Sequence, residues 1–330
     1  MKLDGEKGVI HHFLLDCQVR QFSNHTMISY RHHLDVLSSL LAKLCGVFDL
    51  EQVTVTHLRQ CVQHLMTHVM ETSKGRIHEN GSLLSISSIR GYVRVWKAFF
   101  NWCYQEELIE KNPVTRLTLP KPTKRVIPTF TSEHIEKMLA SCDLNTDMGF
   151  RDYVILLLLL DTGIRLSEIS NLRITDVHDT YIKVFGKGRK EREVGLHPEV
   201  GKLLWKYIYK HRHPKDPNET AVFIGYQRGS GKPLGREGVK DMLTRLQAAC
   251  GLQDIQLSPH VFRHTFAKMY LEQGGEVFKL SRELGHSDVQ ITKLYLEDFG
   301  STEARKEHAS FSPIGRIHLR KQQKRKKKQE

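Results

Sequence analysis

Side chains suited to phosphate chemistry gather in residues 257–295, near the C-terminus. Four of them stand out there, namely His260, Arg263, His286 and Tyr295. Ser258 and Pro259 mark a helix start, since serine caps free backbone N–H groups and proline is tolerated at the first helical position. His260 and Arg263 then lie one turn apart at the positive end of the helix dipole, where an anion is favoured. The pattern predicts a phosphate-binding site.

Tyr295 is the candidate nucleophile of this stretch. A free tyrosine has a pKa of ~10, so at neutral pH it attacks phosphorus only if a neighbour takes its proton and cations absorb charge on the phosphate. The histidines nearby can accept the proton, and the arginine can stabilise the charge on the phosphate. Tyrosines in folded domains usually only pack, and Tyr270 lies in the same region. The role of Tyr295 therefore depends on its spacing from the other groups.

The spacing resembles that of the tyrosine recombinases, the phage integrase and Xer-type family. That family carries H-x-x-R, then L-G-H, then a tyrosine about nine residues later, and here residues 260–263, 284–286 and Tyr295 match. It also carries an arginine in a T-G-x-R-x-x-E turn and a lysine in a hairpin, matched by residues 162–168 and 185–192. Each motif alone is weak, whereas all of them in family order form a specific signal. The resemblance runs from about residue 8 to about residue 310.

The resemblance implies roles for the cationic residues. Arg165 and Arg263 would bind the two non-bridging oxygens of the scissile phosphate, with contacts that tighten as charge develops. Lys187 would protonate the departing 5′ oxygen. Glu168, one turn after Arg165, is expected to orient or support a basic residue rather than to react.

The resemblance also implies the proton transfers and the product. His260 would accept the proton of Tyr295, and His286 would donate a hydrogen bond to the phosphate. The product would be a 3′-phosphotyrosyl enzyme with a free 5′ hydroxyl. Because the bond energy stays in the protein–DNA link, the reaction needs no ATP, no metal and no other cofactor.

A metal site is the competing interpretation of the histidines. His260 and His264 lie four residues apart on the predicted helix, a spacing that lets two imidazoles share a metal. The glutamate of the H-E-x-x-H motif is absent, because Val261 stands in its place. We therefore expect no metal.

The bulk composition indicates a two-domain protein with a polyanionic partner. The chain has 330 residues, which exceeds the usual size of one core, and a formal net charge of +13. Residues 316–330 hold eight Lys or Arg and one acid, so +7 of that charge belongs to the tail and +6 to the rest. The charge favours nucleic acid over a membrane surface.

The cysteines and apolar runs bear on the compartment. The six cysteines lie far apart without a C-x-x-C pair, as in a reduced cytosolic protein. The N-terminus has no signal pattern, and the longest apolar run, residues 154–160, is too short to span a bilayer. We expect a cytoplasmic protein without a membrane segment.

Residues 1–112 are predicted to form a helical DNA-clamp domain, because apolar residues recur at helical spacing and no strand is convincing. The helix at residues 85–104 places aromatic and aliphatic side chains on one face. Its other face carries Arg90, Arg94 and Lys97 at i, i+4 and i+7. The competing interpretation of such a charged face is that it is simply solvated. The resemblance favours a DNA-gripping ridge.

A basic interdomain linker is predicted at residues 113–130, where prolines alternate with cations. Its candidate phosphate contacts are Lys121, Lys124 and Arg125. The catalytic domain should then span residues 131–312, before a basic tail at 313–330. Helices are predicted at 131–139, 151–161, 198–211 and 236–250, with a hairpin of strands 181–185 and 193–196. The turn of that hairpin carries Lys187 and Arg189, a further candidate DNA contact.

The fold class is therefore mainly α with a small antiparallel β-sheet, in the two-domain arrangement of a tyrosine recombinase. The predicted function is site-specific recombination, by integration and excision of a mobile element or by resolution of multimers. The predicted partner is double-stranded DNA, bound by a homotetramer on paired sites. Two alternatives remain open: a monomeric type IB topoisomerase, which uses the same chemistry, and a non-catalytic DNA-binding regulator.

Overall fold

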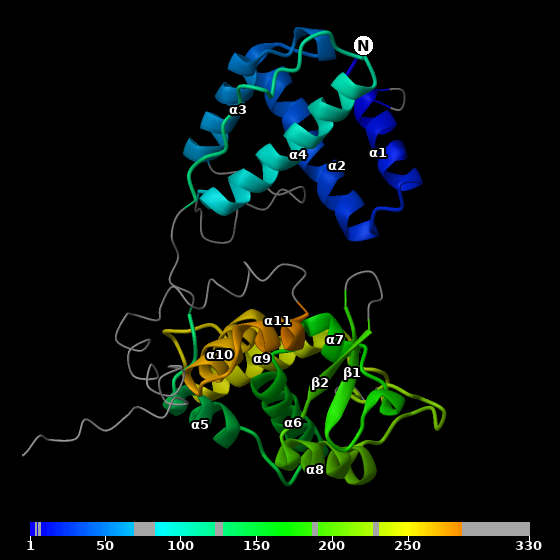
Figure 1. The fold of residues 1–330 in the computed structure, drawn as a ribbon, viewed down its shortest axis with the longest axis vertical. Coiled ribbons are helices and arrows are strands. Elements are labelled where there is room, and N and C mark those ends of the chain that lie inside the picture. Colours follow the sequence, from blue (N-terminus) through cyan, green and yellow to red (C-terminus); the bar gives the residue numbers. More distant parts are fainter. Residues whose placement is uncertain are drawn as a thin grey trace, which may run out of the picture. The chain divides into compact units, whose positions relative to one another are not determined.

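The computed structural model describes residues 1–3, 5, 8–68, 83–122, 128–186, 191–226 and 231–285. The chain divides into two compact units, Met1–Arg125 and Val126–Glu330. Both are mainly helical, and the sheet formed by the described residues is a two-stranded antiparallel hairpin (Figure 1). The predicted mixture of helices with a small antiparallel sheet is confirmed. The exact limits of the clamp, linker, catalytic domain and tail stay a prediction.

The N-terminal unit is a helical bundle. Its elements are α1 (Val9–Val19), α2 (Asn24–Leu40), the π-helical turn η1 (Leu41–Cys45), the 3₁₀ turn η2 (Leu50–Gln52), α3 (Val55–Thr67) and α4 (Ile86–Gln105). Ser23, Thr54 and Ser85 cap the starts of α2, α3 and α4, each by accepting a hydrogen bond from a backbone N–H of the first turn. Helix α4 contacts α1, α2 and α3, so it forms the centre of the bundle.

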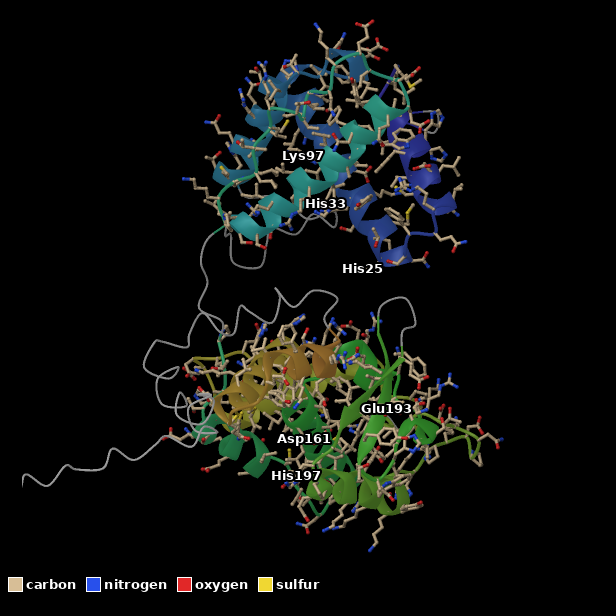
Figure 2. The ribbon with its side chains drawn as sticks, in the orientation of Figure 1. His25, His33, Lys97, Asp161, Glu193 and His197 are labelled. Atoms are coloured by element: carbon tan, nitrogen blue, oxygen red, sulfur yellow. The ribbon has the colours of Figure 1, made fainter. Side chains whose placement is uncertain are left out.

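Helix α4 has the two faces that its sequence predicts. The buried side carries Ile89, Val93, Trp96, Phe99, Phe100 and Cys103. Trp96 donates its indole N–H to the carbonyl oxygen of His33 at 3.0 Å, which ties α4 to α2 without an unsatisfied donor. Figure 2 shows Lys97 on α4, where the helix is only partly covered.

The C-terminal unit surrounds one apolar helix. Its elements are α5 (Ser132–Ala140), α6 (Asp147–Thr162), α7 (Leu166–Ser170), the 3₁₀ turn η3 (Ile174–Asp176), β1 (Tyr181–Phe185), β2 (Glu191–Gly195), α8 (Pro198–Lys206), the π-helical turn η5 (Tyr207–His211), α9 (Arg236–Cys250), α10 (Pro259–Glu272) and α11 (Val277–Leu284). Helix α6 contacts α5, α8, η5 and α10, and its apolar residues lie in the main core of this unit. Helix α6 is therefore a rigid support for the turn that follows it.

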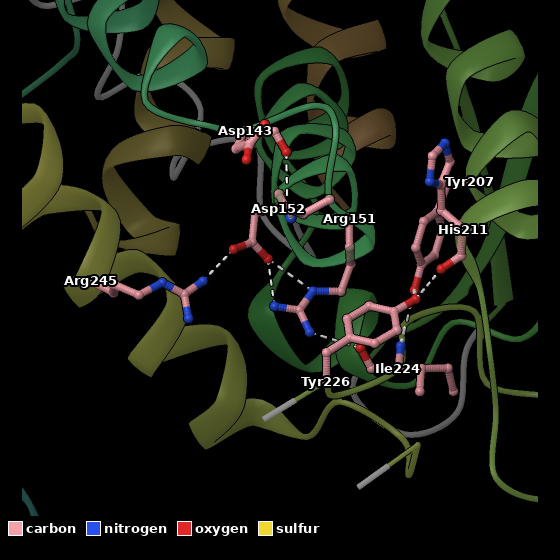
Figure 3. Close-up of polar contacts among 10 residues, drawn as sticks. Asp143, Arg151, Asp152, Tyr207, His211, Ile224, Tyr226 and Arg245 are labelled. Carbon is pink, nitrogen blue, oxygen red and sulfur yellow. Dashed lines mark hydrogen bonds and ion pairs between the residues drawn. The ribbon is translucent and has the colours of Figure 1, made fainter. Parts of the chain in front are cut away.

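A buried charge cluster holds α6 to α9 (Figure 3). Arg151 and Asp152 are each only 2% exposed, and Arg151 Nε donates to Asp152 Oδ1 at 2.8 Å. The other oxygen of Asp152 accepts from Arg245 on α9. Arg151 also donates to the carbonyl oxygen of Ile224 at 2.8 Å and lies over the ring of Tyr226. One carboxylate thus links two arginines from different helices.

The hairpin pairs Tyr181 with Gly195 and Phe185 with Glu191. Strand β2 begins at Glu191, two residues before the predicted start at 193, because the pairing continues up to the turn. Helix α6 likewise begins at Asp147 rather than at 151, since Thr146 caps it by accepting from the N–H of Gly149. The other predicted helices are present. Among the described residues, no helix is long and apolar enough to cross a membrane.

Candidate active site

Arg165 lies in the sharp turn that follows the central helix α6. Gly163 ends α6 in the left-handed conformation with φ +58°, and a Cβ there would come 2.6 Å from a ring carbon of Phe266. Only glycine meets both demands without strain. Arg165 is the N-cap residue of α7, and its backbone N–H donates to Glu168 Oε2 at 2.8 Å. The T-G-x-R-x-x-E pattern thus encodes a turn with a defined arginine position.

Glu168 joins two arginines. Its Oε1 accepts from Arg165 Nη1 at 2.9 Å and from Arg192 Nη1 at 2.7 Å. Its Oε2 accepts from Arg192 Nη2 at 2.9 Å, in addition to the backbone bond from Arg165. Burial alone would raise the pKa of Glu168, but the hydrogen bonds from Arg192 and Arg165 outweigh it and hold the pKa below its usual range. Glu168 is therefore an ionised anchor.

Arg263 is a buried residue of α10, 6% exposed. Its Nη1 donates to the carbonyl oxygen of Gly163 at 2.8 Å, and its Nη2 donates to the carbonyl oxygen of Leu284 at 2.6 Å. A carboxylate would neutralise the charge of a guanidinium, whereas a carbonyl oxygen orients the group and carries no opposite charge. Arg263 thereby connects the turn before Arg165 with the end of α11.

The end of α11 brings the two arginines together. Arg165 Nη2 donates to the carbonyl oxygen of Gly285 at 3.0 Å, next to the Leu284 carbonyl that Arg263 contacts. Gly285 has φ +63°, and a Cβ there would lie 2.9 Å from the guanidinium carbon of Arg192. The L-G-H glycine is therefore required both by the helix end and by the packed arginine.

His260 is exposed in the first turn of α10, after the capping hydroxyl of Ser258. His264, one turn later, is partly buried. Burial lowers the pKa of His264 to about 4, with smaller contributions from His260 and Arg263. His264 is therefore neutral at neutral pH. In the described ranges, no three His, Cys, Asp or Glu side chains are grouped so as to hold a metal.

The predicted site residues fall into two groups. Arg165, Glu168, His260 and Arg263 are described, and the structure brings Arg165, Glu168 and Arg263 to one place around Gly163 and Gly285. Four predicted residues of the catalytic unit lie outside the described residues, namely Lys187, Arg189, His286 and Tyr295. Their roles stay predictions.

The predicted DNA contacts of the N-terminal unit are partly described. Arg94 is exposed on α4, while Arg90 is partly buried and donates to the carbonyl oxygen of Pro120. Lys121 is exposed directly after that proline. Lys124 and Arg125 lie outside the described residues. Arg90 thus also fastens the segment after the bundle to α4.

Arg192 is the last residue of the hairpin motif, and no role for it was predicted from the sequence. In the structure it makes a two-bond pair with Glu168 and donates Nε to the carbonyl oxygen of Glu283 at 2.8 Å. An available signal was strand alternation. Val194 is buried, so residue 192, two positions earlier, shares its face.

Two family models match the chain. The phage integrase family model matches residues 128–300, and the phage integrase N-terminal SAM-like domain matches residues 10–107. The chain therefore belongs to the phage integrase family of tyrosine recombinases. It is a site-specific recombinase, an enzyme that cleaves and rejoins DNA strands, and the predicted family, two-domain architecture and activity are confirmed.

Particular relatives are similar over most of their length. Tyrosine recombinase XerD of Staphylococcus aureus is 30% identical over 257 residues, covering 77% of this chain and 83% of the relative. Tyrosine recombinase XerD of Staphylococcus epidermidis is 28% identical over 312 residues, covering 92% of this chain and 98% of the relative.

Solved structures share the fold. The Tn1549 transposon integrase in complex with circular intermediate DNA superposes with a TM-score of 0.69 at 21% identity, covering 91% of this chain and 98% of that one. A lambda integrase dimer bound to a core site gives a TM-score of 0.66 at 16% identity, covering 86% and 95%. These likenesses extend across both units of the chain.

Proposed function

We propose that this enzyme cleaves one DNA strand by attack of Tyr295 on a phosphate held by Arg165 and Arg263. The observation that supports the proposal most is the shared support of the two guanidinium groups by the consecutive carbonyls of Leu284 and Gly285. Two guanidinium groups fixed side by side match the two non-bridging oxygens of one phosphate. Their fixed position lowers the reorganisation needed as charge develops in the transition state.

The remaining groups complete a metal-free phosphoryl transfer. Tyr295 forms a bond to phosphorus while the bond to the 5′ oxygen breaks, which leaves a 3′-phosphotyrosyl link. The proton of Tyr295 passes to His260, and Lys187 gives a proton to the departing 5′ oxygen, so charges and protons balance. His286 donates a hydrogen bond to the phosphate. Exposure of His260 at the start of α10 is compatible with access of a substrate to this group.

We further propose that the N-terminal unit grips double-stranded DNA through α4. Arg94 and Lys97 project from the side of α4 opposite its aromatic core, where cations can reach a phosphate backbone. Lys121 continues the positive charge beyond the bundle, and Lys124, Arg125 and Arg189 would add contacts. The relatives act as recombinases, so paired sites bound by a tetramer in the cytoplasm are the expected setting.

A suicide-substrate assay tests this function. The DNA carries a nick that lets the cleaved fragment diffuse away, so a covalent protein–DNA complex accumulates. The wild-type enzyme should form it at one position of its site without metal or ATP, and Tyr295→Phe should form none. Recombination between two sites on one plasmid would establish site-specific exchange. Relaxation of supercoils on DNA of any sequence, without exchange, would instead indicate a topoisomerase.

A further inference from the structure

We propose that Arg192 is a positioning residue that lets Glu168 orient Arg165 without neutralising it. The inference rests on the proposed role of Arg165 at the scissile phosphate. Arg192 lies at the second position of β2, far in sequence from its partners Glu168 and Glu283. In the described structure its polar contacts are with Glu168 and with the Glu283 carbonyl near the end of α11, so its effect would be exerted through these groups.

The contacts of Glu168 favour this role. Its side chain is 1% exposed, while that of Arg192 is 14% exposed and that of Arg165 is 36% exposed. Both oxygens of the carboxylate accept from Arg192, at 2.7 and 2.9 Å, whereas only one accepts from the guanidinium of Arg165, at 2.9 Å. The two-bond pair therefore belongs to Arg192, which is the better buried arginine.

Arg192 determines the net charge of the cluster that it forms with Glu168 and Arg165. Glu168 contributes one negative charge, and Arg165 and Arg192 contribute one positive charge each, so the trio carries a net charge of +1. The more exposed arginine, Arg165, can direct this surplus to a phosphate. Without Arg192, the buried carboxylate would have only Arg165 as its described cationic partner and the pair would be neutral. A neutral pair attracts a phosphate anion much less than an uncompensated cation does.

Arg192 also connects three segments that carry predicted catalytic groups. It belongs to the hairpin whose turn contains Lys187, it binds Glu168 beside Arg165, and its Nε holds the Glu283 carbonyl near the end of α11. Its guanidinium fills the space that a side chain at position 285 would need. A substitution at Arg192 should therefore affect the chemical step more than DNA binding.

The test compares Arg192→Gln, Arg192→Lys and the double variant Glu168→Gln/Arg192→Gln with wild type. The rate of covalent-complex formation is measured under single-turnover conditions at saturating enzyme and is normalised to the fraction of folded enzyme. DNA affinity is measured separately. Arg192→Gln should slow cleavage about 10- to 100-fold with little loss of affinity. The double variant restores the net charge of +1 and should cleave about tenfold faster than Arg192→Gln. Arg192→Lys, which keeps the charge, should be faster than Arg192→Gln.

Lys202→Gln is the matched control, because it removes one positive charge from an exposed side chain of α8 that pairs only with Glu199 among the described contacts. It should cleave at the wild-type rate. A double variant no faster than Arg192→Gln would overturn the proposal, since a purely structural role predicts no rescue. If Arg192→Gln does not fold, Arg192→Lys decides: folded Arg192→Lys with cleavage abolished would overturn the charge argument. Failure of wild type itself to form a complex would instead refute the proposed function.

Discussion

Arg165 and Arg263 donate hydrogen bonds to the carbonyl oxygens of two consecutive residues, Gly285 at 3.0 Å and Leu284 at 2.6 Å. The two arginines come from segments about a hundred residues apart, and the C-terminal end of α11 is their common support. Arg263 also holds the carbonyl of Gly163, directly before the turn of Arg165. The position of each guanidinium is thus defined by backbone atoms as well as by side chains.

Arg263→Lys tests the value of that geometry. Lysine keeps the charge but cannot span the carbonyls of Gly163 and Leu284 as a planar guanidinium does. Covalent-complex formation should fall by about 10²- to 10³-fold, as for the loss of one transition-state donor. Lys268→Ala, a partly exposed position of the same helix, is the control and should cleave normally. Equal rates for Arg263→Lys and wild type would show that charge alone suffices.

Gly285→Ala should separate stability from activity. An alanine in the left-handed region costs about 1 kcal/mol of unfolding free energy, and here its Cβ would also displace the Arg192 guanidinium. Gly251 ends α9 with a similar φ of +66°, but a Cβ there meets nothing within 4 Å. Urea unfolding should therefore show a loss for both alanine variants, whereas the cleavage assay should show a loss only for Gly285→Ala. A normally active Gly285→Ala enzyme would contradict the packing argument.

The stability of the C-terminal unit should depend on pH through His264. Burial lowers the pKa of His264 to about 4, below the ordinary value of 6.5, so the unfolded chain takes up a proton that the folded chain does not. This contribution to stability is complete above pH ~6.5 and is lost as the pH falls toward ~4. His264→Gln should flatten the pH dependence of the unfolding free energy in that window. An unchanged slope would mean that His264 is protonated in the folded state.

Asp152→Asn should destabilise the C-terminal unit strongly. The substitution leaves Arg151 and Arg245 without the carboxylate that they share in the interior (Figure 3). Removal of one member of a buried ion pair costs about 3–5 kcal/mol. Thermal or urea unfolding measures the change, with Glu199→Gln as the control, since its pair with Lys202 is exposed. A loss no larger than that of the control would show that the cluster adds little.

Most helices and the hairpin could be predicted from the sequence, because apolar spacing and capping residues act locally. The family could be predicted because its motifs are short and occur in a fixed order. The core face of α4 and the capped start of α10 follow from such patterns. The motifs that contain Gly163 and Gly285 are also local, since these glycines are required by helix ends. Glu168 was expected to support a basic residue, and the structure gives it two.

The network around Arg192 could not be derived from spacing. Its contacts with Glu168 and with the Glu283 carbonyl join residues 24 and 91 positions apart. The packing of β2 against α11 brings Arg192 to Glu283, and the contact with Glu168 on α7 likewise depends on tertiary packing. The Asp161 carboxylate that accepts the N–H of His197 at 2.8 Å is another such contact (Figure 2). Long-range polar contacts depend on tertiary structure, which local pattern does not specify.

Mapping of the DNA-linked residue distinguishes Tyr295 from every other candidate nucleophile. The covalent complex formed on a suicide substrate is digested, and the peptide that retains a nucleotide is sequenced by mass spectrometry. We expect one modified residue, Tyr295, joined to a 3′ phosphate, with no adduct in Tyr295→Phe and a greatly reduced yield in Arg263→Lys. An adduct on another side chain such as Tyr270, or a 5′-phosphate link, would contradict it.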